Sequence, residues 1–303
     1  MSAKIARPSD PARSTDTTRS TDGTHIRWHR LGNGPRRWLL PPGLGTPPSA
    51  WTLLAEHLGP EYSILTWEMR GCYDSGRPAD HRCYGVVHHA DDAIAVLRDA
   101  GWDDNEPLIL GGWSLGVQIS LETYRRLSHR VRALVLLGGP FEHTLQGALP
   151  IPYGDQAIGP LLRALRPGGS LLNPLARRIL AHPKAPHALH RLGVVAHRHP
   201  HLAKVLADFS HLHLGTLIDL SRAAHHHSAR DVLGHITAPT LIVHGDLDQL
   251  TPLRIGREIF ARIPRSRLHV VKGGTHYALL EFPEQVNGAI GDFLAELFTN
   301  IDK

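Results

Sequence analysis

Hydrophobic runs and amphipathic stretches alternate along two parts of this chain. The pattern predicts strands over residues 25–30, 36–41, 62–67, 108–110, 131–137, 239–244 and 268–271. It predicts helices over residues 86–100, 115–127, 253–263 and 283–298, where apolar side chains recur at helical spacing. Strands that alternate with helices in this way favour an α/β fold, with a mostly parallel central sheet and helices on both of its faces.

The alternation stops between residues 140 and 235. This stretch contains apolar patches of helical character at 161–165, 171–180 and 202–220 and no clear strand. Because a structureless loop of this length is uncommon in a compact domain, we expect an inserted all-helical lid over 140–235. The core domain is then expected to comprise residues 23–139 and 236–303. Residues 1–22 are rich in Ser, Thr, Asp and Arg without an apolar period, which predicts a disordered tail.

Composition narrows the class of protein. The chain has 303 residues, of which 42% are hydrophobic and 20% charged, as in ordinary globular proteins. No apolar run approaches the length of a membrane span, and no secretory signal is visible. Residues 1–37 alone account for the net charge of +5, so we expect no nucleic-acid-binding face. Two cysteines make no disulfide scaffold, and we expect a cytoplasmic protein.

The clearest chemical signal is the sequence Gly-Trp-Ser-Leu-Gly at 112–116. It matches the G-x-S-x-G turn, in which a strand turns sharply into a helix and presents a Ser hydroxyl above the edge of the sheet. A Ser hydroxyl becomes nucleophilic only when a His accepts its proton and a carboxylate orients that His. Candidates for both partners follow later strands, namely Asp246 and Asp248 after 239–244 and His276 after 268–271. Such strand ends are where open α/β sheets place their sites.

These residues, in this order, resemble the α/β-hydrolase fold family in its lid-bearing serine esterase-like branch. The resemblance covers roughly residues 24–300. It implies that Ser114 is the nucleophile, His276 the base and Asp248 the triad acid, with Asp246 as the alternative acid, expected instead to structure its loop.

The resemblance also implies an oxyanion hole made by the backbone N–H groups of Leu44 and Leu115. The loop Pro41-Pro42-Gly43-Leu44-Gly45 is similar to the family's His-Gly-x loop, although Pro42 stands where that branch usually has His. Gly43 and Trp113 are the expected substrate-binding residues. Trp113 at this place also occurs in esterases of the superfamily, including ones that cleave acyl-carrier-protein methyl esters.

A second loop, residues 68–75, resembles the family's Asp-x-Arg-Gly-x-Gly-x-Ser loop with two departures. Glu68 replaces the Asp, and Tyr73 replaces the second Gly. Relatives that dehalogenate haloalkanes or open epoxides carry Asp as nucleophile, so Ser114 disfavours those two reactions.

The middle of the chain holds 13 of the 23 histidines, between residues 141 and 235. Adjacent histidines point in different directions on a helix, and no known ligand spacing is present, so we expect polar surface and no metal. The same region is rich in aliphatic residues, most of which are expected to pack the lid onto the core domain and some of which could line an apolar cleft. They are Leu161, Leu162, Leu165, Leu171, Leu172, Leu175, Ile179 and Leu180.

The sequence thus predicts a cofactor-independent serine hydrolase that cleaves a carboxylic ester through an acyl-enzyme. Its partner is expected to be a small to medium, partly apolar ester. The same triad serves thioesterases, lactonases, carbon–carbon bond hydrolases, perhydrolases and peptidases, and fold alone does not separate them. A non-catalytic small-molecule binding protein is the remaining alternative. The sequence leaves the oligomeric state and any role of Cys72 open.

Overall fold

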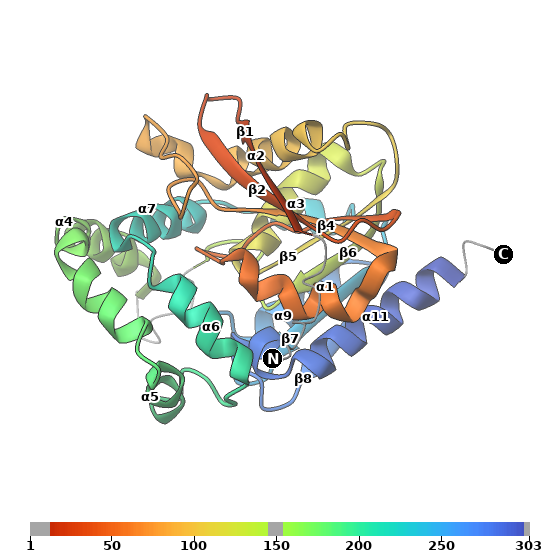
Figure 1. The fold of residues 1–303 in the computed structure, drawn as a ribbon. Coiled ribbons are helices and arrows are strands. Elements are labelled where there is room, and N and C mark those ends of the chain that lie inside the picture. Colours follow the sequence, from red (N-terminus) through yellow and green to blue (C-terminus); the bar gives the residue numbers. More distant parts are fainter. Residues whose placement is uncertain (1–12, 145–153, 300–303) are drawn as a thin grey trace, which may run out of the picture.

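A computed structural model describes residues 13–144 and 154–299 and shows a central sheet flanked by helices (Figure 1). The sheet has eight strands in the order β1-β2-β4-β3-β5-β6-β7-β8. Their bounds are β1 Arg13–Arg19, β2 His25–Leu31, β3 Arg36–Leu39, β4 Tyr62–Trp67, β5 Leu108–Trp113, β6 Val131–Leu137, β7 Thr240–Gly245 and β8 Ser266–Val271.

Most of the sheet is parallel, as the sequence predicts. Strands β4, β3, β5, β6, β7 and β8 pair in parallel, while β2 is antiparallel to both β1 and β4. Every residue of β4, β5 and β7 is buried. Continuous burial of this kind is typical of central strands covered on both faces.

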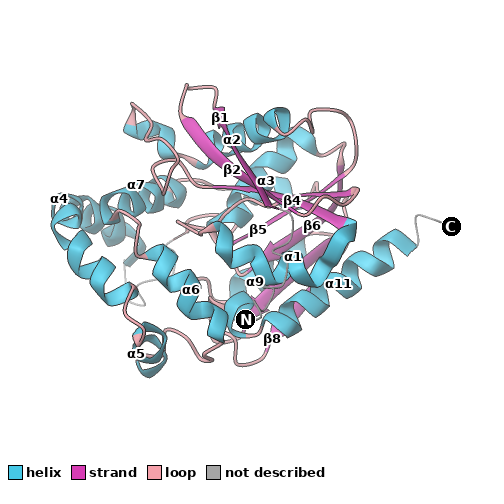
Figure 2. Ribbon diagram, in the orientation of Figure 1, coloured by secondary structure: helices cyan, strands magenta, loops and turns pink. Residues whose placement is uncertain are grey.

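Helices cover both faces of the sheet, as Figure 2 shows. On one face, α1 (Thr52–Leu58) and α11 (Pro283–Thr299) pack through a core that includes Trp38, Trp51 and Ile290. On the other face, α2 (Val86–Asp99), α3 (Leu115–Leu127) and α9 (Leu253–Arg262) pack through a second core. Short elements complete the two layers, namely η1 Pro48–Trp51, η2 Gly59–Glu61, η3 His81–Tyr84 and α10 Ala278–Glu281.

Between β6 and β7, the described residues form five helices. They are α4 Gly154–Leu180, α5 Ala185–Arg191, α6 Pro200–Phe209, α7 Leu214–His225 and α8 Arg230–Leu233. Two of the expected apolar patches fall within the single 27-residue helix α4, whereas the patch at 202–220 is divided between α6 and α7. Only an isolated bridge between Glu142 and Ser228 adds strand pairing to the described part of this segment. Its role as a lid, and the division of the chain into core and lid, stay predictions.

The prediction of a disordered tail over 1–22 is wrong for its second half. Residues 13–19 form strand β1, which pairs along its whole length with β2 as a hairpin. The Thr-rich sequence carries no apolar pattern because β1 is an edge strand whose side chains need no burial, while β-branched Thr suits an extended backbone. Gly23, at φ +81°, forms the turn. Residues 1–12 lie outside the described part of the chain.

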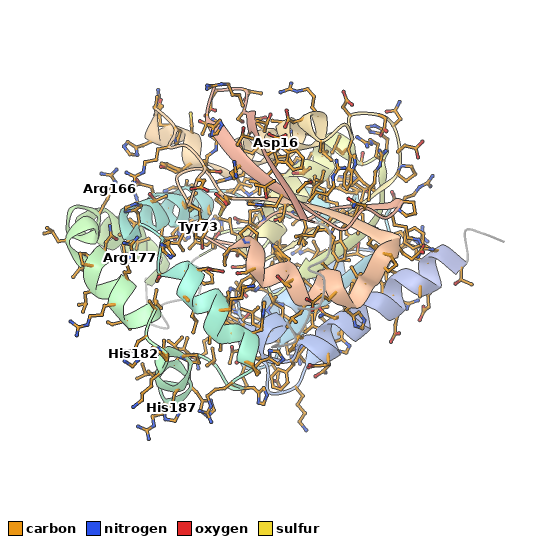
Figure 3. The ribbon with its side chains drawn as sticks, in the orientation of Figure 1. Asp16, Tyr73, Arg166, Arg177, His182 and His187 are labelled. Carbon is orange, nitrogen blue, oxygen red and sulfur yellow. The ribbon has the colours of Figure 1, made fainter. Side chains whose placement is uncertain are left out.

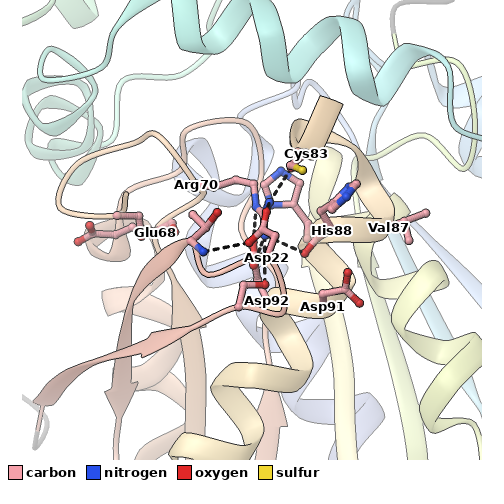
Figure 4. A network of polar contacts seen from close by, with 12 residues as sticks. Asp22, Glu68, Arg70, Cys83, Val87, His88, Asp91 and Asp92 are labelled. Carbon is pink, nitrogen blue, oxygen red and sulfur yellow. Dashed lines mark hydrogen bonds and ion pairs between the residues drawn. The ribbon is translucent and has the colours of Figure 1, made fainter. Parts of the chain in front are cut away.

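A buried guanidinium ties this hairpin to the rest of the domain (Figure 4). The Arg70 side chain is fully buried, and its Nε donates to Asp92 Oδ2 at 2.9 Å on α2. Its Nη1 donates to Asp22 Oδ2 at 2.7 Å in the β1–β2 turn, and its Nη2 donates to Ser20 Oγ at 3.1 Å. One side chain thereby joins the hairpin, the loop after β4 and helix α2. The loop after β4 also borders the site described next.

Candidate active site

Ser114 occupies a sharp turn between β5 and α3. Its backbone has φ +56° and ψ −121°, a conformation that non-glycine residues rarely adopt. Its N–H donates to the Leu137 carbonyl of the neighbouring strand β6 at 2.9 Å. Residues in such strained conformations persist only where the surrounding structure holds them, and they cluster at functional sites.

Both glycines of the Gly-Trp-Ser-Leu-Gly sequence lie against the same backbone group, the carbonyl oxygen of Pro41. A Cβ at Gly112 or at Gly116 would lie 2.4 Å from the carbonyl oxygen of Pro41. A Cβ at Gly43 would lie 3.2 Å from the Ser114 Cβ and 2.8 Å from the Trp113 carbonyl oxygen. The loop after β3 therefore lies directly against the Ser114 turn, and only glycine allows this approach.

Ser114, His276 and Asp248 form a hydrogen-bonded chain. The Ser114 Oγ lies 2.9 Å from His276 Nε2, and His276 Nδ1 lies 2.9 Å from Asp248 Oδ2. His276 and Asp248 are buried, while Ser114 is partly exposed. The three residues come from the ends of β5, β7 and β8, which the parallel sheet brings to a common edge. A base held between a hydroxyl and a buried carboxylate is the arrangement that activates a Ser nucleophile.

The Asp248 carboxylate is held ionised. Burial raises its pKa, but hydrogen bonds from His276 and Thr251 outweigh burial, and the pKa lies below the usual value. Its Oδ1 also accepts the backbone N–H groups of Leu250 and Thr251 at 2.9 and 2.8 Å. By contrast, Asp246 accepts the Gly273 N–H at 2.7 Å and makes no contact with His276 among the described residues. The structure therefore places Asp248, and not Asp246, beside the base.

Thr251 and His244 support the carboxylate from behind, and the sequence analysis assigns neither of them to the site. The Thr251 hydroxyl lies 2.7 Å from Asp248 Oδ2, 2.8 Å from the Gly138 carbonyl oxygen and 3.2 Å from His276 Nδ1. His244 Nε2 donates to the Thr251 carbonyl oxygen, and burial lowers the pKa of His244, which keeps the ring neutral. The position of Thr251 three residues after Asp248 is the one signal of this role in the sequence.

Glu281 is a further residue that the sequence analysis misses. Its buried carboxylate accepts the backbone N–H and the hydroxyl of Thr275 at 2.8 and 3.0 Å, next to His276. Its other oxygen accepts the N–H groups of Ala196 and His197 in the helical segment. Glu281 thus fixes the His276 loop and attaches it to the connection between α5 and α6.

The expected oxyanion donors lie on both sides of Ser114. Leu115 is the first residue of α3, where backbone N–H groups have no partner within the helix. Leu44 lies in the turn after Gly43, the residue whose backbone contacts Ser114. Within residues 13–144 and 154–299, neither the Leu44 nor the Leu115 N–H donates to a protein acceptor. Both donors are therefore free to bind an oxygen atom that develops negative charge.

The two departures in the 68–75 loop have structural counterparts. Tyr73 has φ +49°, the left-handed conformation that the family's Gly adopts easily, and its hydroxyl donates to the Gly45 carbonyl oxygen at 2.8 Å. Glu68 accepts the Asp74 N–H at 2.7 Å and lies 3.0 Å from His29 Nε2. Tyr73 therefore stabilises the turn that carries Leu44 by a contact that Gly could not make.

Trp113 lies beneath the base. The indole is 3% exposed, its N–H donates to the His276 carbonyl oxygen at 3.0 Å, and its ring lies 5.5 Å from the His276 ring. This placement supports the position of His276. Contact between Trp113 and substrate stays a prediction.

A cavity of about 550 Å³ lies next to the loop that contains Leu44, and Ser114, Asp248 and His276 are not among its lining residues. Polar and charged side chains dominate its lining, among them Ser49, Tyr73 and Asp74 from the sheet domain and Arg177 and Lys204 from α4 and α6. Tyr73 and Arg177 lie on the same side of the molecule in Figure 3. Among the aliphatic residues expected to line an apolar cleft, none whose side chain the structure describes lines this cavity.

Four of those aliphatic residues neither pack against the core domain nor line the cavity. Leu171, Leu172, Leu175 and Ile179 are all more than half exposed. The expectation that they pack the lid is therefore wrong for these four, because the packed face of α4 is a different one. The side chains of Leu161 and Leu165 lie outside the described part of the chain.

The histidines of the helical segment do not gather into a ligand set. Over the described residues, no three His, Cys, Asp or Glu side chains lie close enough to hold one metal ion. Several make local contacts instead, such as His201 Nε2 with the Ser49 carbonyl oxygen at 2.7 Å. Both cysteines are free thiols, and burial raises the pKa of Cys72 to about 12. That pKa leaves Cys72 protonated and unreactive near neutral pH.

Comparison with known proteins identifies the family of this chain. The model of the α/β-hydrolase fold family matches residues 39–283. The chain belongs to the α/β-hydrolase fold family and is a hydrolase of that fold. A solved esterase from Thermogutta terrifontis aligns with a TM-score of 0.73 at 20% identity, over 94% of this chain and 99% of that chain. An esterase from Exiguobacterium antarcticum aligns with a TM-score of 0.74 at 20% identity, over 92% and 98%.

Three curated relatives carry different named activities. The mouse serine hydrolase BPHL is 25% identical over 90% of this chain and 84% of its own length. A pimeloyl-[acyl-carrier protein] methyl ester esterase of Neisseria meningitidis is 29% identical over 68% of this chain and 73% of its own. A 2-hydroxymuconate semialdehyde hydrolase of Pseudomonas is 27% identical over 81% of each chain. The relatives thus share hydrolysis and differ in substrate.

Proposed function

We propose that this protein is a serine hydrolase of carboxylic esters, with Ser114 as nucleophile, His276 as general base and Asp248 as the orienting acid. The hydrogen-bonded chain from the Ser114 hydroxyl through His276 to a buried carboxylate is the observation that carries the proposal. Two names among the relatives, a serine hydrolase and a methyl ester esterase, support it.

In the proposed reaction, His276 Nε2 takes the proton of Ser114 as its Oγ attacks the ester carbonyl. The carbonyl oxygen becomes negatively charged, and the N–H groups of Leu44 and Leu115 bind it. His276 then protonates the leaving alcohol. Water, activated by the same His, releases the acid from Ser114 and restores the hydroxyl. Asp248 stabilises the positive charge that His276 carries in both steps.

The cavity beside the oxyanion loop supports a small to medium substrate. Its volume of about 550 Å³ lies within the range of sites for small molecules. Its polar lining favours a hydrogen-bonding or charged end on the partly apolar ester that the sequence predicts. We also propose that the helices between β6 and β7 act as the lid over this substrate, and that the protein is cytoplasmic.

Carbon–carbon bond hydrolysis is the second candidate, because one relative is a 2-hydroxymuconate semialdehyde hydrolase over most of the chain. The same triad residues would serve it. A comparison of p-nitrophenyl esters of increasing chain length with dienone acids distinguishes the two. Turnover of dienone acids alone would overturn the ester assignment.

The direct test is labelling with a fluorophosphonate probe, which reacts with activated serines. We expect the wild-type protein to be labelled and Ser114→Ala to be unlabelled while its circular dichroism spectrum is unchanged. Asp248→Asn is expected to lower kcat on p-nitrophenyl butyrate by a factor on the order of 10⁴. The matched control, Asp246→Asn, keeps kcat within about twofold. Labelling that persists in Ser114→Ala, or a well-folded wild-type protein that is never labelled, would contradict the proposal.

A further inference from the structure

Helix α4 packs against α7 on one face and leaves an apolar stripe exposed on another. The packed face lies on α7, where Asn173 Oδ1 accepts the Leu214 N–H at 2.9 Å and a Cβ at Gly169 would lie 3.1 Å from the Gly215 nitrogen. The other face carries Leu171, which is 83% exposed, with Leu175 and Ile179 at successive intervals of four residues. Because residues four apart share one side of a helix, these three form a stripe directed away from α7.

A further leucine, Leu192, is exposed near the end of α5. It follows α5 and is 76% exposed. Figure 1 shows α4 and α5 at the outer side of the molecule, far from the sheet. We call the exposed surface of α4 and α5 that carries Leu171, Leu175, Ile179 and Leu192 the outer face. A surface helix normally presents polar residues to water, so this face calls for an occupant.

Charge along the segment is strongly one-sided. Residues 156–207 contain eight Lys and Arg and no Asp or Glu. Positive and negative residues are equal in number after residue 37, but they are not evenly distributed along the chain. The cations of this segment are separated in sequence from the carboxylates, so a basic surface is possible here. Arg166 pairs with Asp219 of α7. Arg177 and Lys204 line the cavity described above. Four further cations are exposed and, among the described residues, form no ion pair with a carboxylate: Arg178, Lys184, Arg191 and Arg198. Figure 3 shows His182, which follows α4, and His187 of α5 at the outer side of the molecule.

The positive charge of the segment distinguishes between two possible occupants of the outer face, a second copy of the chain and an anionic membrane. A two-fold dimer through the outer face would bring two sets of cations together with no carboxylate from this segment to neutralise them. An occupant must therefore be anionic, to bind the exposed cations, and must offer an apolar layer that single leucine side chains can enter. The boundary between headgroups and acyl chains of an anionic membrane has these properties. No helix among the described residues could cross a membrane.

We propose that the outer face binds the surface of membranes that contain anionic lipids, with its leucines at the level of the acyl chains and its cations among the headgroups. This binding goes beyond the proposed hydrolysis and does not depend on it. Ser114→Ala is expected to bind membranes as the wild-type protein does, so the two proposals can fail separately.

The test is flotation of the full-length protein with vesicles of phosphatidylcholine and phosphatidylglycerol, mixed seven to three, and with vesicles of phosphatidylcholine alone. We expect binding to the anionic vesicles that is lost at high salt, and little binding to the neutral ones. Arg178→Gln with Arg191→Gln should weaken binding about twentyfold, since each cation near an anionic surface contributes about a factor of five. Leu171→Ser with Leu192→Ser should weaken it about tenfold or more.

Matched controls lie on α9, far along the chain. Phe260 is 45% exposed and Arg257 is exposed, so Phe260→Ser and Arg257→Gln remove an apolar and a cationic surface group elsewhere. Both controls should bind within about twofold of wild type. Absence of binding to anionic vesicles, or equal binding by the outer-face variants, would overturn the proposal. So would a dimer in sedimentation that the outer-face variants dissociate, because the face would then belong to a second copy of the chain.

Discussion

Replacement of Thr251 by Val removes one hydroxyl from behind the proposed triad and preserves the shape of the side chain. The hydroxyl carries a single proton and has two acceptors, the Asp248 carboxylate at 2.7 Å and the Gly138 carbonyl oxygen at 2.8 Å. A hydrogen bond to a charged group contributes about 1.5–3 kcal/mol. Since the proton is shared between two acceptors, we take the lower end of that range, which corresponds to a loss of about tenfold in kcat.

The assay is the kcat and KM of p-nitrophenyl butyrate hydrolysis for wild type, Thr251→Val and Thr251→Ser. A positioning role predicts that kcat falls while KM stays nearly constant, because Thr251 lies behind Asp248 and away from the substrate. Thr251→Ser keeps the hydroxyl and should restore most of kcat. A kcat for Thr251→Val within twofold of wild type would refute the reasoning. So would an equal loss in Thr251→Ser, because that loss would follow from packing and not from the hydroxyl.

Three further predictions concern the parts that hold the site. Asp92→Asn leaves the buried Arg70 guanidinium with only Asp22 as its charged partner, so unfolding free energy should fall by about 3–5 kcal/mol and Tm by about 6 °C or more in calorimetry; an unchanged Tm would contradict the network. Burial raises the pKa of Asp22, yet hydrogen bonds from Thr24 and Arg70 outweigh it and place the pKa at about 2. Because this lies below the value in the unfolded chain, Asp22 stabilises the fold above about pH 4 and loses this effect as pH falls toward 2, so Asp22→Asn should lower Tm at pH 7 but not near pH 2. Tyr73→Phe removes the hydrogen bond to the Gly45 carbonyl, so kcat should fall about fivefold and Tm by only about 2–4 °C; an unchanged kcat would show that the turn carrying Leu44 does not need this bond.

The parallel part of the fold could be predicted because its elements are fixed by local pattern. The strand 131–137 and the helix 115–127 have in the structure the bounds that periodicity indicates. Edge strand β1 could not be found this way, because its polar residues contribute no burial signal and its pairing depends on β2 and on the distant Arg70. The sequence separates α4 into two patches, with Pro167 between them; a proline normally ends a helix, and here it lies within one.

The candidate site likewise contains residues that the sequence could predict and residues that it could not. Ser114, Asp248 and His276 could be predicted because they lie at fixed places after strands whose order the fold dictates. Thr251 and Glu281 could not, because their roles depend on hydrogen bonds to backbone groups such as Gly138 and Ala196 that only the folded chain brings near. The exposure of the outer face could not be predicted either, because periodicity shows that a helix carries apolar side chains but not which of them pack against a neighbour.

The ends of the helical segment are held together where it leaves and rejoins the sheet. The Ala229 N–H donates to the Phe141 carbonyl at 2.8 Å, and the His143 N–H donates to the His227 carbonyl at 3.1 Å. Since β6 and β7 are neighbours in the sheet, this short pairing closes the α/β unit without help from the residues in between. Away from the Ala196 and His197 groups that Glu281 binds, we therefore expect changes in the segment to alter what reaches Ser114 while β6 and β7 keep their register. Selectivity could then evolve at a different rate from the chemistry.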